Sequence, residues 1–375
     1  MANSYCEAWD QVDPSPEADR RILAVLKEYQ RDQGKVIPLH SARPKQKRFG
    51  KVSAVAIAVA ITLSLSVAAY AIANYTDFFD KVFGGPDAGT QSYDLPVDHW
   101  NEDGSRDTME IITEGEPVDQ DTAQRVLDGS ASAPSASITV GDYTCTVENV
   151  AMAENGVGVL NFSVENPNGL PEVHVFDETV KNFNFADDNL ETGAEGGGLI
   201  GAPMFRAPED WDDPMVDAIS FLVTATDTRL EAKTYFALFG DNGCPESLNA
   251  YFFHDEGEQY RLTVPLPEPA EAVELTGPEG WMARISPMGL AITAPEDIGG
   301  DYESGNITVH YADGGKYMVI SSEPYVINSP VSCINESGTT RYVFNRLIDP
   351  AEVSSVTGYV QSYVTDELKD LTFAK

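Results

Sequence analysis

The sequence predicts a membrane-anchored protein whose large outer region is mainly β, preceded by one transmembrane helix and a short cytoplasmic helix. Three observations indicate this: an uncharged apolar run of 23 residues, a basic flank on its N-terminal side, and repeated alternation of apolar and polar residues after it. Hydrophobic residues make up 42% of the 375 positions and charged residues 22%, a globular composition rather than a disordered one.

The apolar run covers residues 52–74 (VSAVAIAVAITLSLSVAAYAIAN). At about 1.5 Å per helical residue it extends roughly 34 Å, enough to cross a hydrocarbon core of about 30 Å. Ala69-Tyr70-Ala71 resembles a signal-peptidase site, but 51 residues before the run and 23 within it exceed the usual lengths in a signal peptide. The run therefore predicts an uncleaved single-pass anchor, with a cleaved signal peptide as the alternative.

The charge distribution predicts the orientation of the anchor. Residues 1–51 hold ten Lys and Arg against seven Asp and Glu, a net charge of +3, whereas residues 75–375 hold 14 against 53, a net charge of −39. Because basic flanks stay inside, the N-terminus is predicted to be cytoplasmic and the C-terminal region extracytoplasmic, at the cell membrane. The acidic outer surface argues against nucleic acid as a partner.

The cytoplasmic segment, residues 1–51, predicts one amphipathic helix at residues 16–33. Ser15 can cap its N-terminus, Pro16 suits its first position, and Gly34 suits the position after its end. Spacing of i, i+3, i+4 and i+7 gathers four apolar side chains on one face: Ile22, Val25, Leu26 and Tyr29.

This apolar face is the candidate partner-binding site, because an exposed helix face of this kind binds in the groove of another protein. Two other ways of covering this apolar face remain open. A basic helix can lie on the inner membrane surface, or the face can pack locally against Tyr5 and Trp9.

The outer region divides into three predicted parts. Residues 75–136 are rich in acids and turn formers and are predicted to form a juxtamembrane stalk, with a short helix within residues 117–127. Residues 137–265 and 270–375 predict two antiparallel β-sandwiches of immunoglobulin-like type, because short alternating segments are separated by frequent turns. The prolines at 265, 267 and 269 suit a stiff connector between them.

Individual strands are marked by two-residue alternation. In the first sandwich they are predicted at residues 143–147, 160–164, 218–224, 234–239 and 260–264, and in the second at residues 307–311, 316–322, 342–345 and 353–359. Glu154-Asn155-Gly156 predicts a hairpin turn, and the glycine-rich stretch 191–201 predicts a surface loop.

No constellation of residues indicates catalysis. The outer histidines are scattered without an H-E-x-x-H, G-x-S-x-G or S-x-x-K motif near them: His99, His174, His254 and His310. In the cytoplasmic segment, Cys6 and His40 do not make a zinc ligand set. The chain is therefore predicted not to be an enzyme and to need no cofactor or metal.

Three cysteines lie in the outer region: Cys145, Cys244 and Cys333. Three thiols allow at most one disulfide and leave one cysteine over. Burial as small apolar residues is the equal alternative to a bond.

Three stretches carry a family resemblance: residues 75–83 (YTDFFDKVF), directly after the span, residues 285–292 (ISPMGLAI) and residues 344–356 (FNRLIDPAEVSSV). Together with the short cytoplasmic helix and single span, they make the chain resemble the bacterial single-pass membrane family of unknown function catalogued as four-one-seven-nine. Its members are often met beside extracytoplasmic-function sigma factors. The resemblance implies an anti-sigma-type regulator with a sandwich module in its second half, and it carries over no catalytic signature.

Two functions of different classes follow. In the first, the chain is a transmembrane regulator whose cytoplasmic helix face holds a sigma factor while the outer sandwiches sense an unknown envelope ligand. In the second, it is a surface-exposed binding or structural module, and the N-terminal part only anchors it. A sigma-factor gene beside this one favours the first.

Overall fold

The structure is a computed structural model, and it describes residues 78, 82–83, 89–100, 106–114, 120–127, 129–170, 173–175, 183–185, 199–211, 213–241, 243–254, 258–298, 302–335, 337–363 and 368–375. The predicted helix at 16–33, the predicted span at 52–74 and the candidate residues Ile22, Val25, Leu26 and Tyr29 lie outside these ranges. In the part that is described, no helix is long and apolar enough to cross a membrane.

The prediction that the chain after residue 74 is mainly β is confirmed, because strands make up most of its described part. A two-turn helix, α4 (Gln120–Val126), lies inside the window predicted at 117–127. Gly129 follows it with a φ of 80°, a left-handed conformation that suits glycine after a helix.

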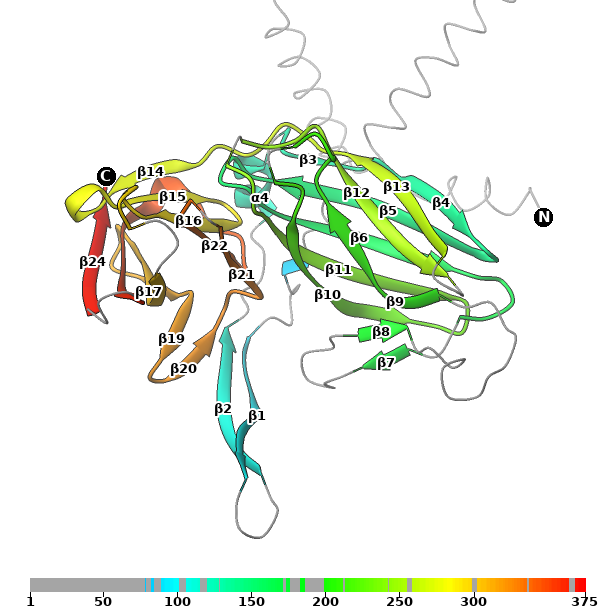
Figure 1. Ribbon diagram of the computed structural model, residues 1–375, viewed down its shortest axis with the longest axis horizontal. Helices are drawn as coiled ribbons and strands as arrows, with labels where there is room; N and C mark the ends of the chain where they lie inside the picture. Colours follow the sequence, from blue (N-terminus) through cyan, green and yellow to red (C-terminus); the bar gives the residue numbers. More distant parts are fainter. Residues whose placement is uncertain are drawn as a thin grey trace, which may run out of the picture. The chain divides into compact units, whose positions relative to one another are not determined.

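The first β region contains two sheets, seen as two layers in Figure 1. One has the order β10-β11-β6-β5-β3, with β4 also paired to β5, and the other has the order β13-β12-β9. Their bounds are β3 (Ala131–Ser132), β4 (Ala136–Val140), β5 (Tyr143–Met152), β6 (Val157–Glu165), β9 (Leu199–Arg206), β10 (Val216–Ala225), β11 (Arg229–Leu238), β12 (Ser247–His254) and β13 (Glu258–Pro265). A separate pair joins β7 (Val173–Val175) to β8 (Phe183–Phe185).

One core lies between these two sheets. Phe162 on β6 packs edge-on against Phe252 on β12, with ring centroids 6.4 Å apart, and both side chains are buried. The alternation that predicted the strands follows from this arrangement, since every second residue of β4, of Tyr143–Val147 in β5 and of the second half of β13 faces the core.

The predicted segments of the first region lie within β5, β6, β10, β11 and β13, apart from the last residue of the segment at 234–239, which follows β11. The glycine-rich stretch differs from its prediction. Its last residues begin β9, because Leu199 pairs with His254 on β12 and buries its side chain in the core. Pairing with a neighbouring strand outweighs the weak strand preference of glycine here.

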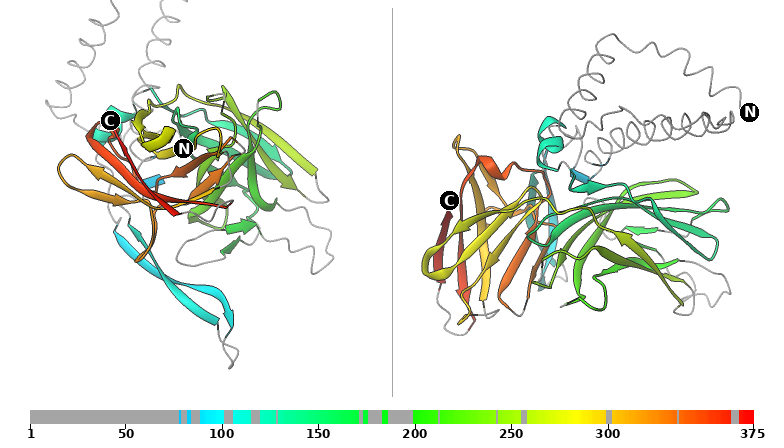
Figure 2. Two further views of the ribbon diagram at one scale, coloured as in Figure 1. Left: turned by 60° about the vertical axis from the view of Figure 1, so that its left-hand side comes forward. Right: turned by 90° about the horizontal axis from the view of Figure 1, so that it is seen from above.

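The second β region is one long sheet with the order β18-β17-β23-β24-β14-β15-β16-β22-β21. Figure 2 gives two further views of these yellow-to-red strands. Their bounds are β14 (Val273–Thr276), β15 (Met282–Ser286), β16 (Gly289–Thr293), β17 (Tyr302–Tyr311), β18 (Lys316–Met318), β21 (Val331–Ile334), β22 (Thr339–Val343), β23 (Val353–Ser362) and β24 (Leu368–Ala374).

The two halves of this sheet meet through a single pair, Thr276 with Ala374, and enclose a common core. Trp281, next to β15, packs edge-on against Tyr302 of β17 at 4.9 Å between ring centroids. Tyr317 of β18 packs in the same way against Phe344, at 5.3 Å. Aromatic pairs between strands distant in the sequence therefore close this sheet over its core.

A third sheet joins the segment predicted as a stalk to the second region. β1 (Thr90–Trp100) and β2 (Arg106–Glu114) form a long hairpin, cyan in Figure 1. β2 pairs in parallel with β20 (Tyr325–Ile327), which pairs with β19 (Ile320–Ser322). The sequence predicted no strand at β1 or β2, because the acids and turn formers there have low strand propensity. The pairing of β2 with β20 is a contact between residues far apart in the sequence, so no local pattern signals it.

Candidate functional site: the junction of the two β regions

A third hydrophobic core lies where the two β regions meet, and we call it the junction. It combines Val157 and Tyr235 of the first region with Met288 and Val343 of the second. It also contains three residues that follow closely after the apolar run at 52–74: Phe78, Val82 and Phe83. We call these three the juxtamembrane residues, because they follow the predicted span in the sequence.

The juxtamembrane residues are buried as completely as any in the protein, with exposed fractions of 1%, 0% and 1%. All three have a helical backbone conformation. In the sequence, Phe78 and Val82 are four positions apart, the spacing of one helix face, and acidic Asp77 and Asp80 interrupt the apolar residues. This sequence pattern is typical of an amphipathic helix, and the structure buries its apolar residues in the junction.

The main-chain carbonyl of Val82 accepts two hydrogen bonds from β11. The Tyr235 hydroxyl donates one at 2.5 Å, and the Lys233 ammonium donates the other at 2.9 Å. Burial raises the pKa of the Tyr235 hydroxyl well above its ordinary value, so this group stays protonated and can donate. Lys233 also lies 5.5 Å from the centre of the Tyr235 ring, and Phe221 packs edge-on against that ring.

The polar part of the junction is centred on Arg341 of β22, which is 5% exposed. Its Nε donates to the carbonyl of Asn155 at 3.0 Å, and its Nη2 donates to the carbonyl of Gly240 at 3.1 Å. Nη2 also forms an ion pair with Asp241 at 3.1 Å. All three partners belong to the first region, so these bonds to a buried charge form only while the regions stay together. The buried Nη1 of Arg341 has no partner among the described residues.

Two glycines allow the two regions to approach closely at the junction. A Cβ at Gly156, whose φ is 80°, would lie 2.8 Å from Nε of Arg341 in the second region, and a Cβ at Gly289 would lie 2.7 Å from Cγ2 of Val157 in the first region. The sequence predicted the turn at Glu154-Asn155-Gly156, and the structure has it between β5 and β6. It did not predict that this turn packs against Arg341.

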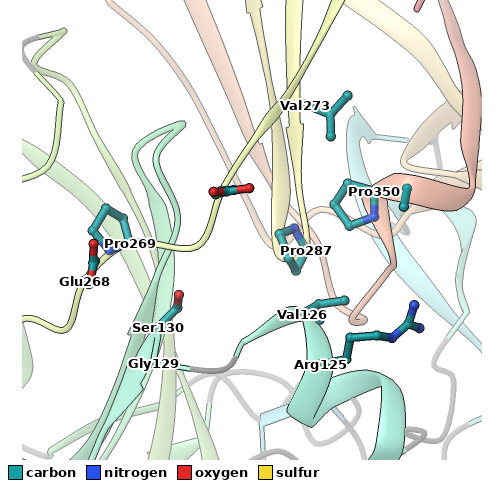
Figure 3. A pocket seen from close by; sticks show the side chains of 11 residues that line it. Arg125, Val126, Gly129, Ser130, Glu268, Pro269, Val273, Pro287 and Pro350 are labelled. Atoms are coloured by element: carbon teal, nitrogen blue, oxygen red, sulfur yellow. The ribbon is translucent and has the colours of Figure 1, made fainter. Parts of the chain in front are cut away.

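Two hollows flank the junction. One, of about 410 Å³, is shown in Figure 3: Arg125 and Val126 reach it from α4, Glu268 and Pro269 from the connector, and Pro287 from the second region. Arg125 forms an ion pair with Asp349 at 2.6 Å.

The second hollow, of about 380 Å³, is lined by charged and hydroxyl groups that include Glu154, Asp241, Arg284 and Ser337. Among the residues that the structure describes, no three His, Cys, Asp or Glu side chains come together as metal ligands. The groups of the junction bond to one another across the two regions, an arrangement that fixes relative position.

The three outer cysteines are free thiols. Cys145 is buried in the core of the first region and Cys333 in the junction, and burial raises the pKa of each thiol to about 12. Cys244 is half-buried, donates to the carbonyl of Ala153 at 3.3 Å, and has its pKa raised to about 11 by burial. The sequence left a disulfide bond and burial open as alternatives, and the structure shows the three cysteines unbonded and buried or half-buried.

A search against protein-family models finds no match, and a search of curated proteins also finds none. Among solved structures, the chain is similar to the conserved domain protein from Bacillus anthracis, with 10% identity and a TM-score of 0.36. That likeness covers 65% of this chain and 91% of the other. At this TM-score it supports no statement about shared fold or function, and the family resemblance drawn from the sequence stays a prediction.

Proposed function

We propose that the chain is a single-pass membrane regulator of the anti-sigma type. In this proposal the outer β regions are immunoglobulin-like modules that sense an envelope ligand, and the cytoplasmic helix face holds a sigma factor. The supporting observation is the burial of the juxtamembrane residues Phe78, Val82 and Phe83 in the junction. A change in how the two regions pack must alter the surroundings of these residues, which adjoin the predicted span in the sequence.

The energy scale of the junction suits a switch. Burying a Phe or Val side chain is worth about 1.5–3 kcal/mol, so freeing all three juxtamembrane residues costs on the order of 5–9 kcal/mol. A ligand therefore releases the juxtamembrane residues only if its binding free energy favours the open arrangement by more than this cost.

The direct test captures the full-length chain in detergent and measures the sigma factor bound to it. Truncating a well-packed Leu costs about 2–5 kcal/mol, so Leu26→Ala is expected to weaken capture by more than tenfold. Val25→Asp should act in the same way and raise the target transcripts. Lys27→Ala, which lies off the apolar face, is the matched control and should change little.

If both apolar-face variants reach the membrane and leave capture and transcription unchanged, the anti-sigma proposal is wrong. The surface-exposed binding module then replaces it.

A further inference from the structure

The three-stranded sheet of the first region has one face in the core and one face toward solvent. Phe205, Ala250 and Leu262 point inward and are buried. Because strand residues alternate, their neighbours point outward. The pairing of β12 with β9 and β13 sets Met204, Tyr251 and Arg261 side by side in one row across the sheet, and Arg206 is two residues from Met204 on the same face.

Two arginine side chains on this outer face have no partner in the part of the chain that the structure describes. Five of the arginines with described side chains make hydrogen bonds or ion pairs: Arg125, Arg229, Arg284, Arg341 and Arg346. Arg206 and Arg261 make none within the described part of the chain, and both are exposed. In a region with 53 acidic residues against 14 basic ones, two guanidinium groups that form no ion pair with a described carboxylate are available to an external anion.

The two arginines border one shallow hollow of about 470 Å³, together with Glu209, Tyr251 and Gln259. Their strands are separated by β12, and Arg206 lies two residues further along its strand than the position level with Arg261. The backbones at Arg206 and Arg261 are therefore roughly 12 Å apart. A guanidinium fork binds a carboxylate through two parallel hydrogen bonds. The half-exposed Tyr251 ring offers a flat apolar surface between them, and the Gln259 amide offers both a donor and an acceptor.

These groups together fit a sugar ring that carries a carboxylate. Tyr251 can stack on the ring, while Gln259 and Glu209 can bond its hydroxyls. Glu209 and the net charge of the outer region disfavour the denser charge of a nucleic acid. An acidic peptide fits less well, because the hollow lies on the face of the sheet, whereas a peptide bound by strand addition pairs with a strand edge.

We infer that the hollow between Arg206 and Arg261 binds a carboxylate-bearing polysaccharide. The two arginines form hydrogen-bonded ion pairs with carboxylates along the polymer, and the Tyr251 ring stacks on a sugar ring between them. This inference names the ligand class of the outer region and in that respect rests on the proposed function, but the binding itself needs no sigma factor.

The test measures binding of the full-length chain, in detergent, to immobilised polygalacturonate. Fully methyl-esterified polygalacturonate has the same backbone without the charge and should not bind. Losing charged hydrogen bonds should weaken polygalacturonate binding by about tenfold or more in Arg206→Ala and in Arg261→Ala. Arg206→Lys keeps the charge without the fork and should show an intermediate loss.

Two comparisons separate this site from general electrostatics. Lys316→Ala removes one exposed positive charge from the second region and should leave binding unchanged. Poly-glutamate should bind far more weakly than polygalacturonate. The inference is overturned if polygalacturonate does not bind, if poly-glutamate binds equally well, or if Lys316→Ala weakens binding as much as Arg206→Ala.

Failure of this inference is distinguishable from failure of the proposed function. Loss of polysaccharide binding in Arg206→Ala leaves capture of the sigma factor by unliganded protein intact. Conversely, if the chain captures no sigma factor but binds polygalacturonate through both arginines, the site stands and the chain is a binding module.

Discussion

Arg341 in the junction and Arg206 on the outer face of the three-stranded sheet carry the same guanidinium group in opposite surroundings. Arg341 is buried and bonded to two carbonyls and a carboxylate of the other region, whereas Arg206 is exposed and bonds to no described residue. In a chain this acidic, a basic side chain is neutralised easily. The difference therefore separates a group that holds the protein together from a group that is free to meet a ligand.

The largest effect on stability is expected at the juxtamembrane residues. Phe83 is 1% exposed in the junction, and truncating a buried Phe typically costs about 3–5 kcal/mol. Phe83→Ala in the full-length chain should lower the urea midpoint of the outer region, followed by tryptophan fluorescence. If the junction transmits the signal, it should also change the target transcripts while the cytoplasmic helix is intact. An unchanged midpoint would show that the juxtamembrane residues are not docked in solution.

Arg341→Ala is expected to be the next most severe change. It removes three hydrogen bonds and leaves two carbonyls without their donor, although Asp241 is partly solvated, so the expected cost is about 2–4 kcal/mol. Arg284→Ala is the matched control, because its ion pair with Glu154 is exposed on both sides and should contribute at most about 1 kcal/mol. Equal urea midpoints for the two variants would contradict the comparison between buried and exposed arginines.

The sequence predicted the strands better than it predicted the junction, and the reason is physical. In β5 and β13 each residue's own hydrophobicity records whether it faces the core, so alternation was readable. In β1 and β2 the deciding contact is a distant strand, β20, which leaves no local pattern.

The junction depends on long-range contacts in the same way. Arg341 meets Asn155, 186 positions earlier, and nothing near either residue signals it. One local signal was present: the apolar spacing of Phe78, Val82 and Phe83 in an acidic segment is typical of a docked helix. Whether the side chains of Arg206 and Arg261 find a partner likewise depends on residues distant in the sequence, so the sequence could not predict it.

Alkaline pH should act on the junction through Tyr235. Burial raises the pKa of its hydroxyl above the ordinary value of about 10, so above that pH the native protein keeps a proton that the unfolded chain loses. Its contribution to stability is therefore complete below about pH 10 and is lost as the pH rises further, by about 1.4 kcal/mol per pH unit for one proton.

Tyr235→Phe lacks this proton and should lose stability less steeply than the wild type between pH 10 and 11. At pH 8 it should be destabilised by about 1 kcal/mol through the lost bond to Val82. Urea midpoints at each pH give both quantities. The other buried tyrosines titrate equally in the two proteins, so identical slopes would mean that Tyr235 is not buried in the junction.

Removing the Arg206 and Arg261 side chains is expected to have the smallest effect on stability and the largest effect on polysaccharide binding. The side chains of Arg206 and Arg261 are exposed and make no bond within the described residues, so truncating them breaks no contact among those residues. The double variant Arg206→Ala with Arg261→Ala should therefore keep the urea midpoint of the wild type within error. A clear drop in the midpoint would mean that these arginines stabilise the fold, and the distinction between a structural and a free guanidinium group would no longer hold for this protein.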